Sequence, residues 1–301
     1  MKLRRIRTAD TLQTQWLDGG QWQTLTTPSP LAPSPFSAEF ELATAARHLK
    51  SSDALLPFTP LSFRDFLLCK QHNIAAARGL LKRFYPGQSR ITSAYEKLTR
   101  RTFPLFQPKK LFYQQPIYHM SNAMTIVPTR TPVAFPGYTR GLDFELEIGF
   151  VLNSALYNAT PTEATAAIGA FVLLNDFSAR DIQRSEMASG LGPQKSKHFL
   201  SSMSETAVTA DEVLPRLESL SGAVIINGRT VSTVDGSGLQ WSVGEVLAHA
   251  SRDEQLLAGE VIGLGTLAGG SGMETGNWLR PGDTLRLELD DIGSVEHTIS
   301  K

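Results

Sequence analysis

Residues 144–148 read Phe-Glu-Leu-Glu-Ile, and this alternation limits what the chain can fold into. A period of two is typical of a β-strand, so Glu145 and Glu147 are predicted to point to the same face. Two like charges side by side on a largely apolar strand repel each other unless a positive charge lies between them. A hard divalent cation is the usual answer, since Mg²⁺ and Ca²⁺ prefer oxygen ligands.

The composition is that of a globular protein. The chain has 301 residues, of which 41% are hydrophobic and 19% are charged, enough for one large domain or for a small and a large one. No apolar run approaches the length of a membrane span, and no apolar segment follows the positively charged N-terminus, so no membrane partner is expected. With Cys69 alone there can be no intrachain disulfide and no Cys-rich metal site, which makes a cytoplasmic protein the default expectation.

Positive charge is concentrated in one segment, although the net charge is zero. Eleven lysines and arginines lie between Arg64 and Lys110, against only Asp65 and Glu96. We interpret the segment as a solvated helical face, or as a basic region docked on an acidic one. The alternative is the steering of an anionic substrate. Nucleic-acid binding is not expected, because the basic residues are not interleaved with exposed-looking aromatics.

The first third of the chain is predicted to be partly helical. Residues 26–37 are a proline- and serine-rich connector, and residues 37–50 are weakly helical in composition. Residues 64–85 have a strongly helical composition, whereas residues 86–110 read as basic and irregular. We predict an N-terminal domain over residues 1–111.

From about residue 112 the chain is predicted to be β-rich. Turn sequences such as Asn227-Gly228 recur, and residues 284–289 alternate as a half-buried strand does. Capping boxes at Thr160 and Ser242 predict two helices, the first running toward Phe171 and the second to about Ser251. The fold class is therefore α+β and β-rich. A mixed β-roll or sandwich over residues 112–301 is favoured over a doubly wound sheet.

Two groups of polar residues have helical spacing. Asp176, Arg180 and Gln183 would share one face if a helix began near Asp176; the alternative is a capping Asp176 with an ordinary Asp–Arg pair. Asp65 and His72 are seven residues apart in the helical stretch and would also share a face. A lone histidine there is more often a surface or core residue than a catalyst.

Two glycine-containing segments complete the set. Residues 263–268 fit G-x-G-x-x-A formally, but no helix follows, so a glycine-rich loop at an active site fits better than a dinucleotide site. A Gly/Pro loop at residues 191–199 carries Lys195 and Lys197, and its plainest interpretation is an exposed basic loop.

Taken together, residues 56–277 resemble the fumarylacetoacetate hydrolase family. Leu-Asp-Phe-Glu-Leu-Glu at 142–147 is similar to the family's paired-glutamate strand, and residues 175–183 are similar to its N-D-x-S-A-R-D-x-Q signature. Lys197 lies where the family has its active-site lysine, and the segment around Gly265 and Trp278 resembles its C-terminal loop and hairpin. The spacing of Asp65 and His72 is similar to that of a further metal carboxylate and the catalytic histidine.

The resemblance implies a metal site and an assembly. The ligands would be Asp65, Glu145, Glu147 and Asp176, and the ion Mg²⁺, Ca²⁺ or Mn²⁺. The N-terminal domain would contain a small SH3-like barrel, the C-terminal domain would be the family's mixed β-roll, and the protein would be a homodimer. Arg180 and Lys197 nearby would balance the charge of four carboxylates.

The resemblance also implies a reaction. His72, oriented by Glu274, would take a proton from water, and Lys197 would act with Arg180 and Gln183 on the oxyanion or enolate. Thr266 would contact the substrate. The expected reaction is metal-dependent hydrolysis of a carbon–carbon bond in a 1,3-dicarbonyl such as an acylpyruvate. The choice between Lys195 and Lys197 stays open.

Some positions depart from the family. Tyrosines that contact substrate in the hydrolases proper are here Leu67 and Met187, which makes the pocket more apolar and favours a less polar acylpyruvate or β-diketone. Tyr118 or His119 would supply polar contacts instead. Two alternatives remain: decarboxylation of 2-oxo acids or isomerisation or hydration of 2-hydroxy-dienoates on the same site, and a non-catalytic, metal-stabilised binding protein.

Overall fold

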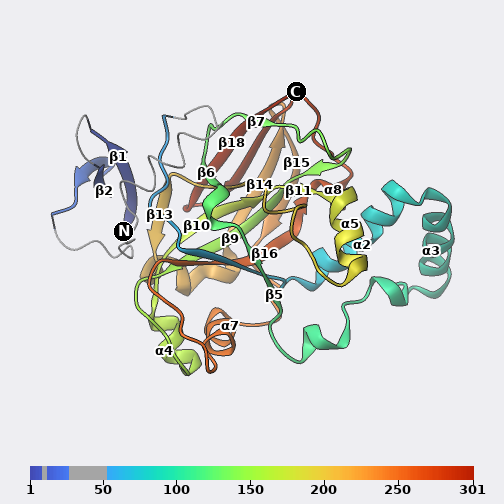
Figure 1. Cartoon of the computed structure of the whole chain (residues 1–301), viewed down its shortest axis with the longest axis horizontal. Helices are drawn as coiled ribbons and strands as arrows, with labels where there is room; N and C mark the ends of the chain where they lie inside the picture. The colour runs from blue at the N-terminus through green and yellow to red at the C-terminus, as the bar shows by residue number, and fades with distance from the viewer. Residues whose placement is uncertain (9–11, 27–52) are drawn as a thin grey trace.

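The computed structural model describes residues 1–8, 12–26 and 53–301, and most of its strands belong to two sheets (Figure 1). The strands of the larger sheet are β1 (Lys2–Arg7), β2 (Leu12–Asp18), β3 (Gln21–Thr24), β4 (Ser62–Phe66), β5 (Tyr118–Ser121), β6 (Ile126–Pro128), β9 (Glu145–Leu152), β10 (Ile168–Asp176), β12 (Ser201–Met203), β13 (Thr206–Thr209) and β16 (Glu260–Ser271). Its main path is β3-β2-β1-β13-β10-β9-β16-β4-β5.

The smaller sheet has the order β15-β14-β17-β18-β7. Its strands are β7 (Val133–Ala134), β14 (Ser221–Ile226), β15 (Arg229–Asp235), β17 (Thr284–Leu289) and β18 (Gly293–Ser300). A separate short pair consists of β8 (Leu142–Asp143) and β11 (Ser178–Ala179). Asn227 and Gly228 both have positive φ between β14 and β15, as the predicted Asn-Gly hairpin requires. The predicted β-rich α+β fold is confirmed.

The helices lie around the sheets rather than between them (Figure 1). They are α2 (Lys70–Phe84), α3 (Pro86–Thr99), α4 (Pro161–Ala166), α5 (Arg180–Ser189), α6 (Ala210–Val213), α7 (Val243–Ala250) and α8 (Gly272–Thr275), with 3₁₀ turns η1 (Pro104–Phe106), η2 (Lys110–Tyr113), η3 (Ala123–Thr125) and η4 (Leu214–Ser219). Both predicted capping boxes form, at α4 and α7. Within the described residues, no helix is long and apolar enough to cross a membrane.

The central strands β9 and β10 are buried along their whole length because apolar side chains cover both faces. One face contributes Leu146, Ile148 and Phe150 to a core shared with Leu285 and Leu287 of the smaller sheet. The opposite face contributes to a second core, which contains Phe63, Val151, Val172, Leu174 and Val261. The acidic residues of β9 alternate with the first set, so they point to the second face.

Three predicted helix boundaries are wrong. Residues 64–66 lie in β4, and α2 begins only at Lys70, so Asp65 and His72 are not on one helical face. Asp176 ends β10 and caps no helix, since α5 begins at Arg180. The helix that begins after Thr160 stops at Ala166 because the next residues pair in the sheet as β10. In each case long-range strand pairing overrides local helical composition.

Two segments expected to be irregular are regular. Pro86–Thr99 forms α3, with Pro86 in the first turn, where its missing N–H costs nothing. The glycine-rich stretch from residue 263 belongs to the continuous strand β16, with register shifts between Gly263 and Thr266 and again before Ser271. The proline-rich connector and the weak helix predicted over residues 37–50 lie almost entirely outside the described residues.

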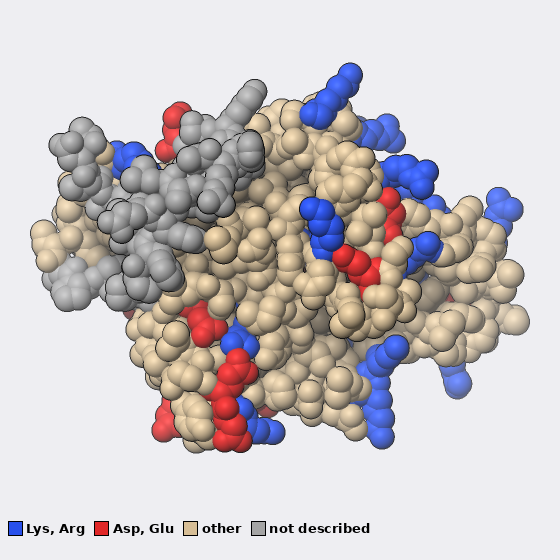
Figure 2. Space-filling model, in the orientation of Figure 1, with Lys and Arg blue, Asp and Glu red and all other residues tan. Residues whose placement is uncertain are grey.

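The basic segment is mainly a solvated helical surface, as predicted. Thr92 is the buried residue of α3, and Arg78 of α2 pairs with Glu96 on the surface. Figure 2 shows lysines and arginines along the side on which α2, α3 and α5 lie, and acidic residues gathered toward α4 and α7.

Candidate active site

Four buried carboxylates meet on one face of the larger sheet. Asp65 comes from β4, Glu145 and Glu147 from β9, and Asp176 from the end of β10. All four are less than one-tenth exposed. In the strand order β10-β9-β16-β4, β16 lies between Asp65 of β4 and the glutamates of β9. The site therefore depends on which side chain β16 has at this position.

A glycine makes room for these carboxylates. Gly263 of β16 is paired with Asp65 on one side and with Gly149 on the other. A Cβ at this position would lie 2.7 Å from Asp65 Oδ1 and 3.1 Å from Glu147 Oε2. Because Gly263 has no side chain, the acids of β4 and β9 can approach each other across the intervening strand β16.

The acids differ in their electrostatic environment. Burial, together with neighbouring carboxylates, raises the pKa of Asp65 and Glu147 well above the usual range, and burial also raises the pKa of Asp176. Burial acts in the same direction on Glu145, but Arg180 and Lys197 outweigh it and hold the pKa of this carboxyl below its usual value. Glu145 is thus the acid whose charge is already compensated by the protein.

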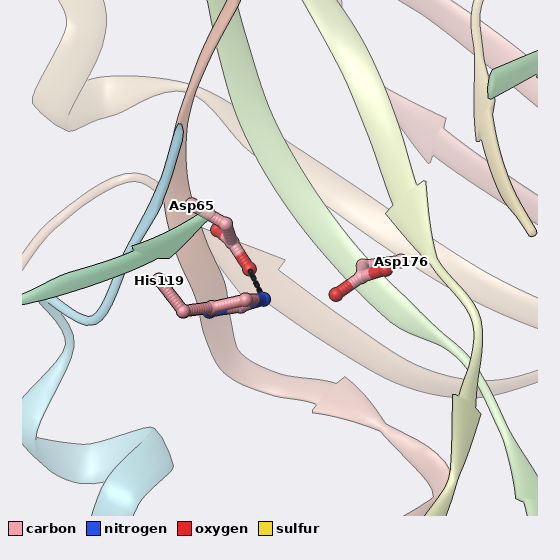
Figure 3. Close-up of side chains that lie close together, drawn as sticks. All are labelled: Asp65, His119 and Asp176. Carbon is pink, nitrogen blue, oxygen red and sulfur yellow. Dashed lines mark ion pairs between the residues drawn. The ribbon is translucent and has the colours of Figure 1, made fainter. Parts of the chain in front are cut away.

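The residues fit a divalent cation. Asp65 Oδ1 and Glu147 Oε2 are buried and have no hydrogen-bond partner, a costly state for a carboxylate unless an ion or a proton satisfies it. Asp65, His119 and Asp176 each offer one ligand atom, and these atoms lie within 4.8 Å of one another (Figure 3). The two aspartates belong to the predicted ligand set, whereas His119 was expected to contact substrate.

A buried lysine pairs with two of these acids. Lys197 contacts Glu145 and lies 2.6 Å from Asp176 Oδ2. Lys195, by contrast, is exposed and lies over the ring of Tyr138. Of the two candidate lysines, the structure therefore places Lys197 in the site.

Arg180 forms a buried fork at the start of α5. Its Nε donates to Asp143 Oδ2 at 2.8 Å, one terminal nitrogen donates to Glu145 at 2.7 Å, and the other to Gln183 at 2.9 Å. Asp143, on the short strand β8, also accepts from the Met273 N–H and so ties Arg180 to α8. Asp143 belongs to the sequence motif, but its pairing with Arg180 depends on the fold and could not be predicted from the motif.

His72 and Glu274 form a dyad. His72 Nδ1 lies 2.9 Å from Glu274 Oε2, and Nε2 faces Glu145 at 3.8 Å. Glu274 is the third residue of α8 and completes its capping box, in which the Ser271 hydroxyl and N–H both donate to the same carboxylate oxygen. Both side chains are buried. The predicted catalytic pair therefore meets, although its members are about two hundred residues apart.

A buried histidine lies beneath the site. His297 Nδ1 is 2.7 Å from the Thr131 carbonyl, which can only accept, so Nε2 accepts from the Ser202 hydroxyl at 2.8 Å. Ser202 also accepts from Asn175, whose side-chain oxygen accepts the Glu145 N–H. This series of hydrogen bonds holds the start of β9 in position.

Burial lowers the pKa of His297 from its usual 6.5 to about 4. Because the unfolded chain takes up this proton first, stability present above about pH 6.5 should be lost as the pH falls toward 4, by on the order of 3 kcal/mol. We expect urea unfolding of His297→Gln to show a shallower pH dependence over this range than that of the unaltered protein. Identical slopes would contradict the assignment.

Comparison with known proteins identifies the family. A family model described as "Fumarylacetoacetate (FAA) hydrolase C-terminal" matches residues 91–300, more than half of the chain. The chain belongs to the fumarylacetoacetate hydrolase family. The resemblance seen in the sequence is thereby confirmed. Asp65 and His72 precede the matched residues.

Curated family members include enzymes with a different named activity. Human "Oxaloacetate tautomerase FAHD1, mitochondrial" is 26% identical over 155 residues, which cover 52% of this chain and 70% of the relative. "Oxaloacetate tautomerase YisK" of Bacillus subtilis is 26% identical over 185 residues, covering 58% and 60% of the two chains.

Solved structures support the fold. A fumarylacetoacetate hydrolase from psychrophilic Exiguobacterium antarcticum aligns with a TM-score of 0.69 and 18% identity over 100% of this chain and 99% of that chain. A fumarylpyruvate hydrolase from Pseudomonas aeruginosa, in complex with Mn²⁺ and pyruvate, aligns with a TM-score of 0.61 and 17% identity over 84% and 94%. At these identities the likeness establishes the fold.

Within this family fold, a cavity of about 300 Å³ opens over the carboxylates. Its lining includes His72, Lys197, Arg180, Gln183 and Thr266, whose hydroxyl lies 3.3 Å from Glu147 Oε1. The lining also includes the apolar residues Leu67, Ala76, Ile117, Met187 and Met273. Leu67 and Met187, the positions at which the resemblance implies family tyrosines, both line this cavity.

Proposed function

We propose that the protein is a divalent-metal-dependent hydrolase that cleaves a carbon–carbon bond in a 1,3-dicarbonyl of the acylpyruvate type. The observation that carries this proposal is the His72–Glu274 dyad, with 2.9 Å between Nδ1 and the carboxylate, at the edge of the carboxylate cluster. A histidine oriented by a buried carboxylate is an arrangement that activates water. Isomerisation of an enol needs no such nucleophile.

The carboxylates Asp65, Glu145, Glu147 and Asp176 would hold Mg²⁺, Mn²⁺ or Ca²⁺. When bound, the ion would supply Lewis acidity that polarises a carbonyl oxygen of the substrate. Glu145 has counter-ions in Arg180 and Lys197, and Asp176 shares Lys197, so Glu145 would add less net negative charge at the ion than Asp65 or Glu147 does.

The proton transfer belongs to His72. Glu274 Oε2 lies 2.9 Å from Nδ1 and would stabilise a proton there, which leaves Nε2 to take a proton from a water molecule in the cavity. The hydroxide equivalent adds to the carbonyl carbon of the acyl group. Breakage of the adjacent carbon–carbon bond returns its electron pair to the departing enolate, and His72 can deliver the proton to the enolate carbon.

Donors around the cavity would stabilise the developing charge. Lys197 is buried, and its pKa is raised because the pull of Asp176 and Glu145 outweighs the effect of burial, so it stays charged. Arg180 holds Gln183 in position, and the amide of Gln183 faces the cavity. The apolar side chains of Leu67 and Met187 in the lining would accept an alkyl or aryl acyl group, which favours a less polar substrate than fumarylacetoacetate.

The direct test is incubation with Mg²⁺ or Mn²⁺ and a panel of acylpyruvates, β-diketones and oxaloacetate, following enol absorbance and identifying the products. Two fragments from a diketone, one of them a carboxylic acid, would establish hydrolysis. Release of carbon dioxide from oxaloacetate alone would indicate a decarboxylase. A metal-dependent thermal shift without turnover of any substrate would support a binding protein.

A second candidate is tautomerisation or isomerisation of a 2-oxo acid. It is favoured by the curated relatives, which are named oxaloacetate tautomerases. The same His72 could move a proton between carbon and the enol oxygen without adding water. Faster equilibration of keto and enol oxaloacetate, with no cleavage of any diketone, would decide for this activity.

Replacement of Glu147 with glutamine should remove both the metal and the activity, because the amide withdraws a charge from the cluster while keeping its shape. Metal content after dialysis, measured by atomic emission, checks this expectation. Glu296→Gln, an exposed change on β18, is the matched control and should keep its metal. Full metal occupancy in the Glu147 variant would refute its role as a ligand.

The homodimer and the cytoplasmic location remain predictions. Light scattering coupled to size-exclusion chromatography tests the first.

A further inference from the structure

His119 is placed beside the carboxylates by strand pairing. It lies on β5, whose antiparallel register puts it directly opposite Asp65 of β4. Directly opposed residues of neighbouring strands point to the same face and have Cβ atoms about 5 Å apart. Since Asp65 points to the face of the carboxylate cluster, the imidazole must point there too, as Figure 3 shows.

The ring nitrogen nearest the cluster has no hydrogen-bond partner. His119 Nε2 is buried and unpaired, and it lies 3.8 Å from Asp65 Oδ2, beyond hydrogen-bond distance. Asp65 Oδ1 and Glu147 Oε2 are also buried and unpaired. Three unsatisfied atoms in one buried place, one of them nitrogen, indicate a shared partner that accepts lone pairs.

The spacing fits a single ion. The ligand atoms of Asp65, His119 and Asp176 all lie within 4.8 Å of one another. Bonds of about 2.1–2.4 Å to one ion put opposite ligands roughly 4.2–4.8 Å apart. These three residues come from β4, β5 and β10, so the ion would join the edge strand of the site to its centre.

The geometry points to His119 as a direct ligand of the metal, giving a mixed nitrogen and oxygen ligand set that selects first-row transition metals such as Mn²⁺ or Co²⁺ over Mg²⁺ and Ca²⁺. The inference rests on the proposed function for the position of the metal. Its chemical basis is that imidazole binds transition metals more strongly than it binds the hard ions, which favour oxygen alone. His119 then belongs to the metal site and not to the substrate contacts expected from the sequence.

The test is made without substrate, so that a substrate contact gives no signal. Pulsed electron paramagnetic resonance on the Mn²⁺-loaded protein should show coupling to a ¹⁴N nucleus, and the coupling should disappear in His119→Ala. Calorimetry should show Co²⁺ affinity reduced by at least about tenfold in this variant, against less than about threefold for Mg²⁺. His249→Gln, a change on α7, should leave both measurements unaltered.

The metal-free His119→Ala variant should unfold at the same temperature as the metal-free unaltered protein, which would confirm that the variant folds. If the variant does not fold, His119→Gln is used in its place. Absence of nitrogen coupling in the unaltered protein, failure to bind Mn²⁺, or equal losses of Co²⁺ and Mg²⁺ affinity would each overturn the inference. Nitrogen coupling in a protein that cleaves no dicarbonyl would leave the inference standing and reject the proposed hydrolase. Cleavage without nitrogen coupling would do the reverse.

Discussion

Replacing His72 with alanine is expected to lower kcat by about two to four orders of magnitude, the usual contribution of a general base. Nδ1 of the imidazole lies 2.9 Å from Glu274 and Nε2 lies 3.8 Å from Glu145, so loss of the ring removes the proton acceptor and leaves the proposed metal ligands in place. Steady-state kinetics and metal content, measured on the same preparation, check both parts.

Two further variants sharpen this test. Glu274→Gln keeps the size of the side chain but cannot stabilise the imidazolium, so kcat should fall while KM changes little. Gln71→Ala, an exposed change one residue from His72, should behave as the unaltered protein. Loss of metal in the His72 variant would count against its assignment as the base, and unchanged turnover would refute it.

Replacing Gly79 with alanine should destabilise the protein by about 1–3 kcal/mol and also lower kcat. Gly79 lies in α2 where this helix packs on α8, and a Cβ there would lie 1.7 Å from the Met273 carbonyl oxygen. The neighbour is backbone, so α2 must move away from α8, and His72 moves with it away from Glu274. Urea unfolding and kinetics measure the two effects.

The sign of the change in the free energy of unfolding shows whether the added Cβ collides with α8. Alanine is a better helix former than glycine by about 1 kcal/mol, so without the contact the substitution would stabilise the protein. Gly87→Ala in α3 is the matched control, because a Cβ there meets nothing within 4 Å. We expect no loss of stability in the control. A Gly79 variant as stable and active as the control would show that the helices tolerate the extra carbon.

Local patterns in the sequence predicted the parts of the site that depend on local structure. The alternation around Glu145 and Glu147 predicted a strand with both acids on one face, which is what β9 provides. The capping boxes predicted the starts of α4 and α7 for the same reason, since capping involves residues only three positions apart.

Features that depend on distant partners escaped prediction. Asp65 lies in a stretch of helical composition, yet it is in a strand because β4 pairs with β16, about two hundred residues later. The pairing of Asp143 with Arg180 and the close approach of Gly79 to α8 likewise depend on which elements become neighbours. For the contact between α2 and α8, the local signal in the sequence was Gly79 itself, because an isolated glycine in a helical pattern often marks the close approach of another backbone.

The position of β4 between β16 and β5 also has a consequence for how the protein acquires its site. Closing the loop from Asp65 to Gly263 is entropically costly, so this parallel pairing is expected late in folding. Until then Glu147 and Asp176 lack both Asp65 and the neighbouring His119. If the proposed ligands hold an ion, an immature chain would lack two of them, and metal uptake would report that the last strand has been inserted.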